Sequence, residues 1–164
     1  MNTTFSSRLR NAAGPALLFL SCAFALACGH SFEAKTPPGF VELDEEDTSH
    51  AYRATTADGL VVAVREIAHD PKGELGFWTR AIENELRQRG GYALLATLDV
   101  KTRSGLVGKE LRFGHDEGTK PHEYRVTVFV TDDKLYLLEV GGTKALVESH
   151  ARDLDEYVAS FRVK

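Results

Sequence analysis

The strongest constraint on the fold is a pair of alternating segments that meet at Asp132-Asp133. In "HEYRVTVFVT", residues 122–131, every second residue is apolar: Tyr124, Val126, Val128 and Val130. "KLYLLEVG", residues 134–141, follows the two aspartates directly. Because neighbouring side chains of a strand point to opposite faces, this pattern predicts an antiparallel hairpin with one apolar face.

Two more strand pairs are predicted upstream. Asp58-Gly59 is a two-residue hairpin signal between "HAYRATTA" and "LVVAVREI", residues 50–57 and 60–67. The segments "YALLATLDVKT" and "GLVGKELRFG", residues 92–102 and 105–114, are predicted to pair around Arg103-Ser104. Gly108 within the second segment indicates a bent or closely packed strand. We therefore expect about six strands.

Two amphipathic helices interrupt the strands. Residues 74–91 carry an apolar stripe at spacings of three and four, formed by Leu75, Trp78, Ile82 and Leu86. Residues 143–161 repeat the pattern with Val147, Ala151, Leu154, Val158 and Phe161, and Thr143 is the expected N-cap. The order of elements predicts an α+β fold, an antiparallel β-sheet of about six strands covered on at least one face by the two helices.

The N-terminal segment is typical of a bacterial export signal. Arg8 and Arg10 precede an uncharged run at 12–27, which ends in small residues. As a helix this run would be about 24 Å long, and the hydrocarbon core of a bilayer is about 30 Å thick. The alternative, a transmembrane anchor, is therefore disfavoured.

Cys28 stands directly after the expected cleavage point, Ala25-Leu26-Ala27. The stretch resembles a lipobox, the signal of bacterial lipoproteins, although the usual leucine is displaced to Leu26. Cleavage before Cys28 would remove Cys22 and leave one cysteine in an exported chain. Lipid attachment is the favoured interpretation of Cys28, and a free thiol or an intermolecular disulfide are the alternatives.

These signals divide the chain into a signal peptide at 1–27, a lipidated cysteine with a short tether at 28–38, and one domain at 39–164. The tether is predicted because "GHSFEAKTPP" lacks apolar periodicity and ends in two prolines. The whole chain has a formal net charge of −4 and no cationic stripe, so a nucleic-acid partner is not expected.

The succession of pieces resembles the PsbP-like family, in its DcrB/LpqN-type bacterial lipoprotein branch. The resemblance rests on "TPPGFVEL" at 36–43, "LVGKELRF" at 106–113, the hairpin at 124–140 and "YVASFRV" at 157–163. It implies a PsbP-like sandwich and a non-enzymatic domain that binds a protein or a small ligand. The family has no shared catalytic residues that could be transferred to this chain.

Chemical motifs are scarce. The sequence has no G-x-S-x-G, no G-x-G-x-x-G and no C-x-x-C. The segment "HDEGTKPHE", residues 115–123, offers nitrogen and oxygen donors, and His115 and His122 are a speculative pair of metal ligands. The alternative is a solvated hairpin connection.

We therefore expect a non-catalytic binding or assembly module without a cofactor. It would be anchored through acyl chains on Cys28 in the cell envelope, on the outer membrane facing the periplasm, with an unidentified envelope protein or small ligand as partner. The alternatives are a small-ligand or metal carrier, and a hydrolase that uses Asp, Glu and His in a cleft.

Overall fold

The strands form one large antiparallel sheet in a computed structural model that describes residues 30–44 and 49–164. The sheet has seven strands, in the spatial order β2 (Val41–Glu42), β3 (Tyr52–Thr55), β4 (Val61–Ala68), β8 (Lys134–Thr143), β7 (Lys120–Val130), β6 (Val107–Glu117) and β5 (Ala93–Lys101). A separate two-stranded sheet pairs β1 (Phe32–Glu33) with β9 (Arg162–Val163). The predicted α+β class is confirmed, with one more strand in the main sheet than expected.

The predicted hairpins are present. In β7 and β8, Val128 pairs with Leu137 and Val126 pairs with Glu139, so the expected alternation sets the register. The turn at 58–59 joins β3 to β4, and Gly59 has a φ of 95°, which glycine adopts without strain. Both faces of the sheet centre are buried, because Thr127 and Phe129 on the second face are also covered.

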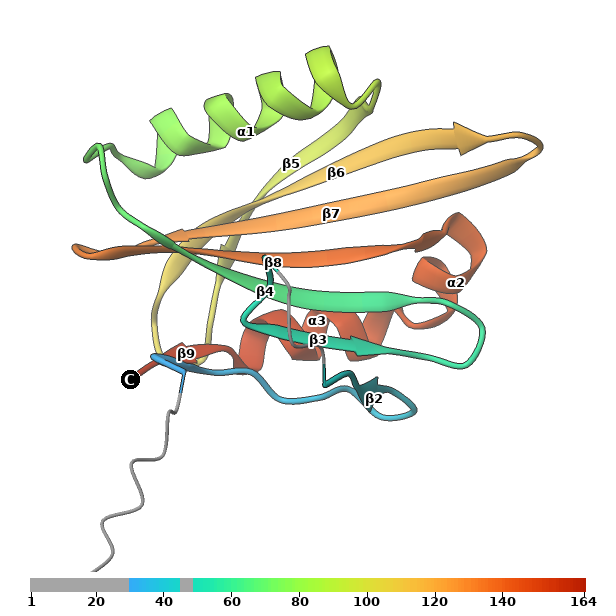
Figure 1. Cartoon of the computed structure of the whole chain (residues 1–164), viewed down its shortest axis with the longest axis horizontal. Coiled ribbons are helices and arrows are strands. Elements are labelled where there is room, and N and C mark those ends of the chain that lie inside the picture. The colour runs from blue at the N-terminus through green and yellow to red at the C-terminus, as the bar shows by residue number, and fades with distance from the viewer. Residues whose placement is uncertain (1–29, 45–48) are drawn as a thin grey trace, which may run out of the picture.

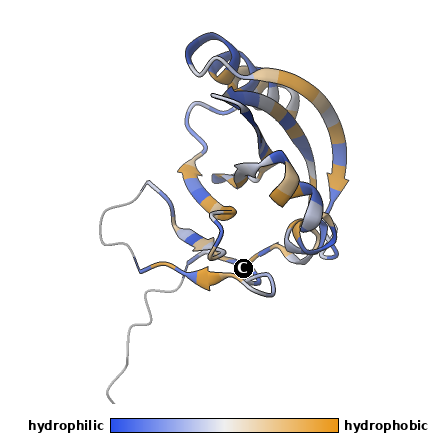
Figure 2. Ribbon diagram, turned by 90° about the vertical axis from the view of Figure 1, so that its right-hand side faces the viewer, coloured by the Kyte–Doolittle hydropathy of each residue, from blue (hydrophilic) through white to orange (hydrophobic). Residues whose placement is uncertain are grey.

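Helices cover the two faces of the sheet (Figure 1). The first helix, α1 (Leu75–Arg89), lies over β5, β6 and β7, and its apolar stripe packs against Val126, Val128 and Leu137. The other two, α2 (Lys144–Ser149) and α3 (Ala151–Ser160), cover the opposite face, where the larger core lies. Figure 2 shows how strongly the long strands curve, with polar and apolar residues alternating along them.

The predicted last helix is two helices. Thr143 caps the first of them as expected, since its side chain accepts a hydrogen bond from the backbone N–H of Leu146. His150 then leaves helical geometry between α2 and α3, with φ of −101° and ψ of 11°. The break lets Val147, on α2, and Leu154 and Val158, on α3, all reach the same core.

The segment expected to be a tether is largely part of the domain. Phe32 is buried in the larger core, where its ring lies 5.6 Å from that of Phe161. The hydroxyl of Thr36 accepts a hydrogen bond from Tyr52, and the backbone N–H of Lys164 donates to the carbonyl oxygen of Ser31. The domain therefore begins several residues before Gly39.

No helix among residues 30–44 and 49–164 has the length and apolar character that crossing a bilayer requires. The expected signal peptide and Cys28 lie outside the described residues.

Candidate functional site

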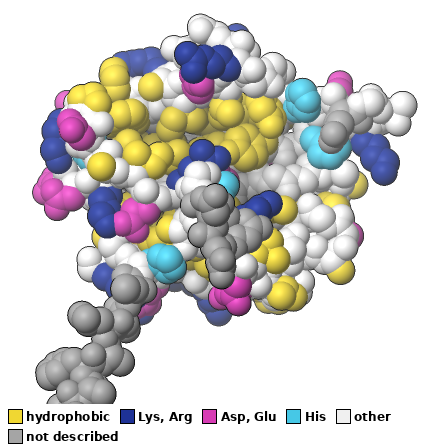
Figure 3. Space-filling model, viewed as in Figure 1, with side chains coloured by type: hydrophobic (Ala, Val, Ile, Leu, Met, Phe, Trp, Pro, Cys, Tyr) yellow, Lys and Arg dark blue, Asp and Glu magenta, His cyan; other side chains and the backbone are white. Residues whose placement is uncertain are grey.

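The most distinctive surface feature is a groove between α1 and the sheet. The stripe residues Trp78, Ile82 and Leu86 face the sheet but are only partly buried, so the helix does not close the space beneath it. The groove has a volume of about 300 Å³ and is lined by Arg65, Trp78, Ala81, Ile82, Glu85, Leu86, Tyr124, Val126, Leu137 and Glu139. Figure 3 shows this region as a broad apolar patch below α1.

Local sequence explains why the groove is open. Ala81 is a small residue on the side of α1 that faces the groove, between larger apolar neighbours. Val126 and Leu137 come from β7 and β8 and form the apolar floor. A volume near 300 Å³ is at the lower end of the range for small-molecule sites, and an apolar anchor side chain of a protein partner would also fit.

A polar network borders the groove on β4, β7 and β8. The carboxylate of Glu139 accepts hydrogen bonds from Tyr124 Oη at 2.6 Å and Arg65 Nε at 3.1 Å, and His50 Nε2 lies 2.9 Å from it. Glu139 is 7% exposed and Tyr124 and His50 are partly buried, whereas the Arg65 side chain is 38% exposed. A buried carboxylate needs such partners, because burying an unpaired charge is strongly unfavourable.

Within this network, the hydroxyl of Tyr124 holds its proton tightly. Burial raises the pKa of the Tyr124 hydroxyl, and the charge of Glu139 and the hydrogen bond to it raise this pKa further. Tyr124 therefore stays protonated and donates to Glu139 over the whole physiological pH range. The arrangement is suited to presenting fixed hydrogen-bonding groups at the edge of an apolar surface.

The groove continues past the network into a second hollow. This hollow measures about 230 Å³ and shares Arg65, Tyr124 and Glu139 with the first. Its floor includes Ala63 and Gly141, whose small size leaves the sheet face open. Together the hollows form one surface with an apolar half under α1 and a polar half on β4 and β8.

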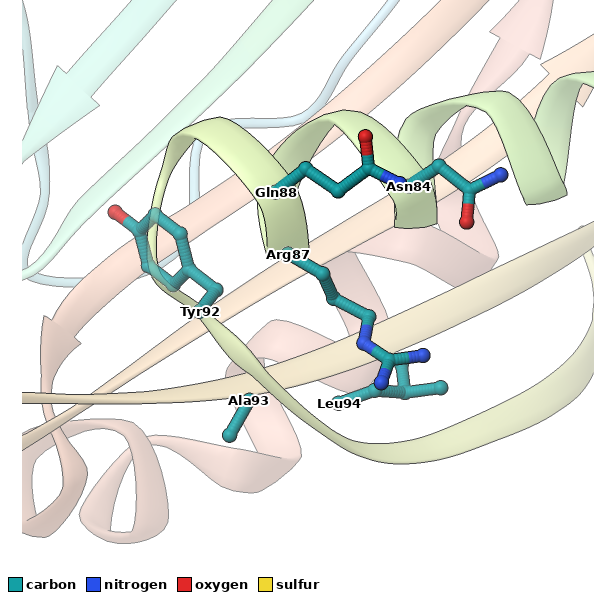
Figure 4. Close-up of a pocket in the computed structure, with 6 residues that line it drawn as sticks. All are labelled: Asn84, Arg87, Gln88, Tyr92, Ala93 and Leu94. Carbon is teal, nitrogen blue, oxygen red and sulfur yellow. The ribbon is translucent and has the colours of Figure 1, made fainter.

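A larger hollow of about 670 Å³ lies beside the C-terminal half of α1 and the start of β5. Figure 4 shows the amides of Asn84 and Gln88 lying along the helix, while the guanidinium of Arg87 extends over Leu94. Arg87 also binds Glu83 on the same helix at 3.0 Å. The polar groups of this larger hollow spread along one exposed helix face and do not converge. We therefore regard the groove between α1 and the sheet as the better site.

The structure places His115 and His122 directly opposite each other in β6 and β7. The ring of His115 lies 5.1 Å from that of Tyr92, and His122 Nδ1 is 3.1 Å from the carbonyl oxygen of Lys120. Within the described part of the chain, no three His, Cys, Asp or Glu side chains are grouped so that they could hold a metal ion. Metal binding by the two histidines stays a prediction.

Sequence reasoning missed the residues of the groove network. Glu139 interrupts the apolar run "LYLLEV", and Arg65 follows the apolar run "VVAV". A charged residue at an inward position of a central strand is a usable signal for a buried polar site. Nothing in the sequence, however, indicates that β4 and β8 are neighbours, and their pairing is what brings these two residues together.

Comparison with known proteins identifies the fold. No family model and no curated relative matches the sequence. Three similar solved structures are CyanoP, LpqN and Mog1p. CyanoP, the cyanobacterial PsbP of Synechocystis sp. PCC 6803, has a TM-score of 0.55 and 16% identity over 82% of this chain and 87% of its own.

LpqN of Mycobacterium tuberculosis, described as involved in cell envelope biogenesis, gives a TM-score of 0.61 with 8% identity over 81% of this chain and 83% of LpqN. The Ran-binding protein Mog1p of Saccharomyces cerevisiae gives 0.60 with 14% identity, over 84% of this chain and 92% of Mog1p. At these identities the likeness is one of fold. The chain therefore has a PsbP/Mog1-like α+β fold, as the sequence resemblance implied.

Proposed function

We propose that the protein is a non-catalytic binding module of the cell envelope, held at a membrane by lipid on Cys28, and that its binding site is the groove beneath α1. The observation that carries the proposal is the open apolar floor beside a carboxylate that is already fully hydrogen-bonded. Such a site offers area for contact and fixed polar groups for orientation, which is what recognition needs.

The location is supported by the sequence of the first 28 residues, with its basic start, its short apolar run and Cys28 directly after the expected cleavage point. We place the lipid-anchored domain in the periplasm, on the outer membrane. One structural neighbour, LpqN, is involved in cell envelope biogenesis, and another, Mog1p, binds Ran. These descriptions support a binding or assembly role and do not specify the partner of this chain.

A hydrolase is the second candidate, because His50 and Glu139 lie 2.9 Å apart in a cleft, as in many acid–base pairs. Two features count against it. The described residues that line the groove include no serine, threonine or cysteine that could act as a nucleophile. The carboxylate is also committed to hydrogen bonds from Tyr124 and Arg65, and Tyr124 keeps its proton.

The proposal is tested by a photocrosslinking amino acid at Glu85, which lines the groove, in the full chain expressed in cells. Arg80, exposed on the same helix and absent from the groove lining, is the matched control position. We expect a discrete adduct, seen by gel or mass spectrometry, from position 85 and not from position 80.

A second substitution shows whether the groove itself is required. Ala81→Trp would fill the space beneath α1 and should abolish the adduct at position 85, while circular dichroism stays unchanged. An adduct that persists with the groove filled, or that forms equally at position 80, would contradict the proposal.

A further inference from the structure

The end of the domain that carries β1 and β9 lies directly next to the point where the chain leaves for Cys28. The carbonyl oxygen of Ser31 is fixed by the backbone N–H of Lys164 at 2.9 Å, and Phe32 is buried. Ser31 is the third residue after Cys28, and a fully extended chain spans at most about 11 Å over these three steps. An anchor on Cys28 would therefore hold this end close to the lipid headgroups.

This end is basic although the chain as a whole is acidic. Three segments meet there: 30–35, the β5–β6 turn at 101–106, and 162–164, with Glu33, Lys35, Arg103 and Arg162 lining one shared hollow. The basic residues of these segments are Lys35, Lys101, Arg103, Arg162 and Lys164, and Glu33 is the acidic one. The formal net charge of the whole chain is −4.

The acidic partners at this end leave a positive excess. Arg103 forms an ion pair with Glu156 of α3, and Arg162 Nε binds Glu33 at 2.7 Å. All four of these side chains are at least 40% exposed, so the pairs are weak and remain accessible to other anions. Lys35, Lys101 and Lys164, which belong to these three segments, are exposed as well.

From this arrangement we infer that the β1–β9 end, with its basic side chains, docks on anionic lipid headgroups once Cys28 is anchored. The inference rests on the proposed lipid anchor and adds an orientation to it. The maximum distance of about 11 Å between Cys28 and Ser31 is close to the Debye length, which is about 8 Å at physiological ionic strength. Charges held within that distance still act on the surface, and each basic residue near an anionic membrane adds to the attraction.

The orientation has a consequence for the groove. Figures 1 and 2 show α1 at the end of the molecule opposite β1 and β9. Docking by the β1–β9 end therefore holds the groove away from the bilayer, where a partner can reach it.

Hydrogen–deuterium exchange of the full chain, matured in cells and anchored on vesicles, tests the inference. If mass spectrometry finds no lipid on Cys28, the thiol of Cys28 is coupled to a maleimide lipid before the measurement. Docking can then be tested even if the cells do not attach a lipid, so the two proposals can fail separately. Vesicles that contain phosphatidylglycerol are compared with vesicles of phosphatidylcholine alone. We expect exchange at residues 101–106 to slow on the anionic vesicles, and exchange in α1 to be equal on both.

Charge reversal at this end provides the decisive variant. Lys35→Glu with Lys101→Glu should lower the ratio of docked to free domain by at least about tenfold. Arg80→Glu with Lys120→Glu makes the same change in net charge away from this end and should leave protection intact. Equal exchange on the two kinds of vesicle, protection of α1 instead, or an equal response of the two double variants would overturn the inference.

Discussion

Glu139 shows how one residue can set the character of a surface. It occupies an inward position in β8 and is buried beside Ala63 and Val126, its pairing partners on the neighbouring strands. The side chains of Tyr124, Arg65 and His50 surround its carboxylate, and contact with it fixes the direction in which each of them points. The polar half of the groove is consequently rigid, while the apolar half under α1 stays open.

Tyr124→Phe should change the pH dependence of stability. Burial raises the pKa of Tyr124, so above pH ~10 the unfolded chain loses this proton while the folded protein keeps it. Stability of the wild type should therefore fall as pH rises, by about 1.4 kcal/mol per pH unit from this group, and the variant lacks that component. At pH 8 the variant should be less stable by about 1–2 kcal/mol, because its hydrogen bond to Glu139 is lost.

Urea unfolding between pH 8 and pH 11 measures the difference. The two proteins should converge as pH rises above 10. A stability gap that stays constant across this range would show that Tyr124 is not held protonated by its surroundings.

At the scale of elements, the close contact between β6 and β7 depends on Gly108. A Cβ at this position would lie 2.5 Å from the carbonyl oxygen of Val128 and 2.6 Å from the ring of Phe129. Phe129 is fully buried and stacks on Phe161 of the C-terminal segment, so it has no room to move. The mid-strand glycine of the sequence is thus a position of close packing, as its pattern indicated.

Gly108→Ala should destabilise the domain by about 1–3 kcal/mol, since the added methyl group overpacks a filled core. Gly114→Ala on the same strand is the control, because a Cβ there would meet Leu95 at an ordinary 3.4 Å. Chemical denaturation should show a lower midpoint for the first variant and little change for the second. Equal midpoints for the two variants would contradict the packing argument.

Strands and helices could be predicted from the sequence because their signals are local. Alternation in 122–131 and the stripe of Leu75, Trp78, Ile82 and Leu86 follow directly from strand and helix periodicity. The groove could not be predicted, because it depends on the strand order and on how far α1 stands from the sheet. The role of Phe32 was missed for a related reason: one aromatic residue in a polar segment has no periodicity to reveal its burial.

At the scale of the whole molecule, the fold separates the surface proposed to face the membrane from the surface proposed to bind a partner. The β1–β9 end includes the start of the described chain, and the groove lies below α1 at the other end (Figure 1). A tethered binding module needs this separation, since the side that is bound to the membrane cannot also receive a partner. The proposed function and the proposed orientation both depend on the anchor.

Intact mass spectrometry with membrane flotation of the wild type and of Cys28→Ser tests that dependence most directly. The account predicts a wild-type chain that begins at Cys28, carries the mass of two or three acyl chains and floats with membranes, whereas Cys28→Ser neither gains this mass nor floats. A Cys28→Ser protein that still floats, or a wild-type chain without added lipid mass, would contradict it.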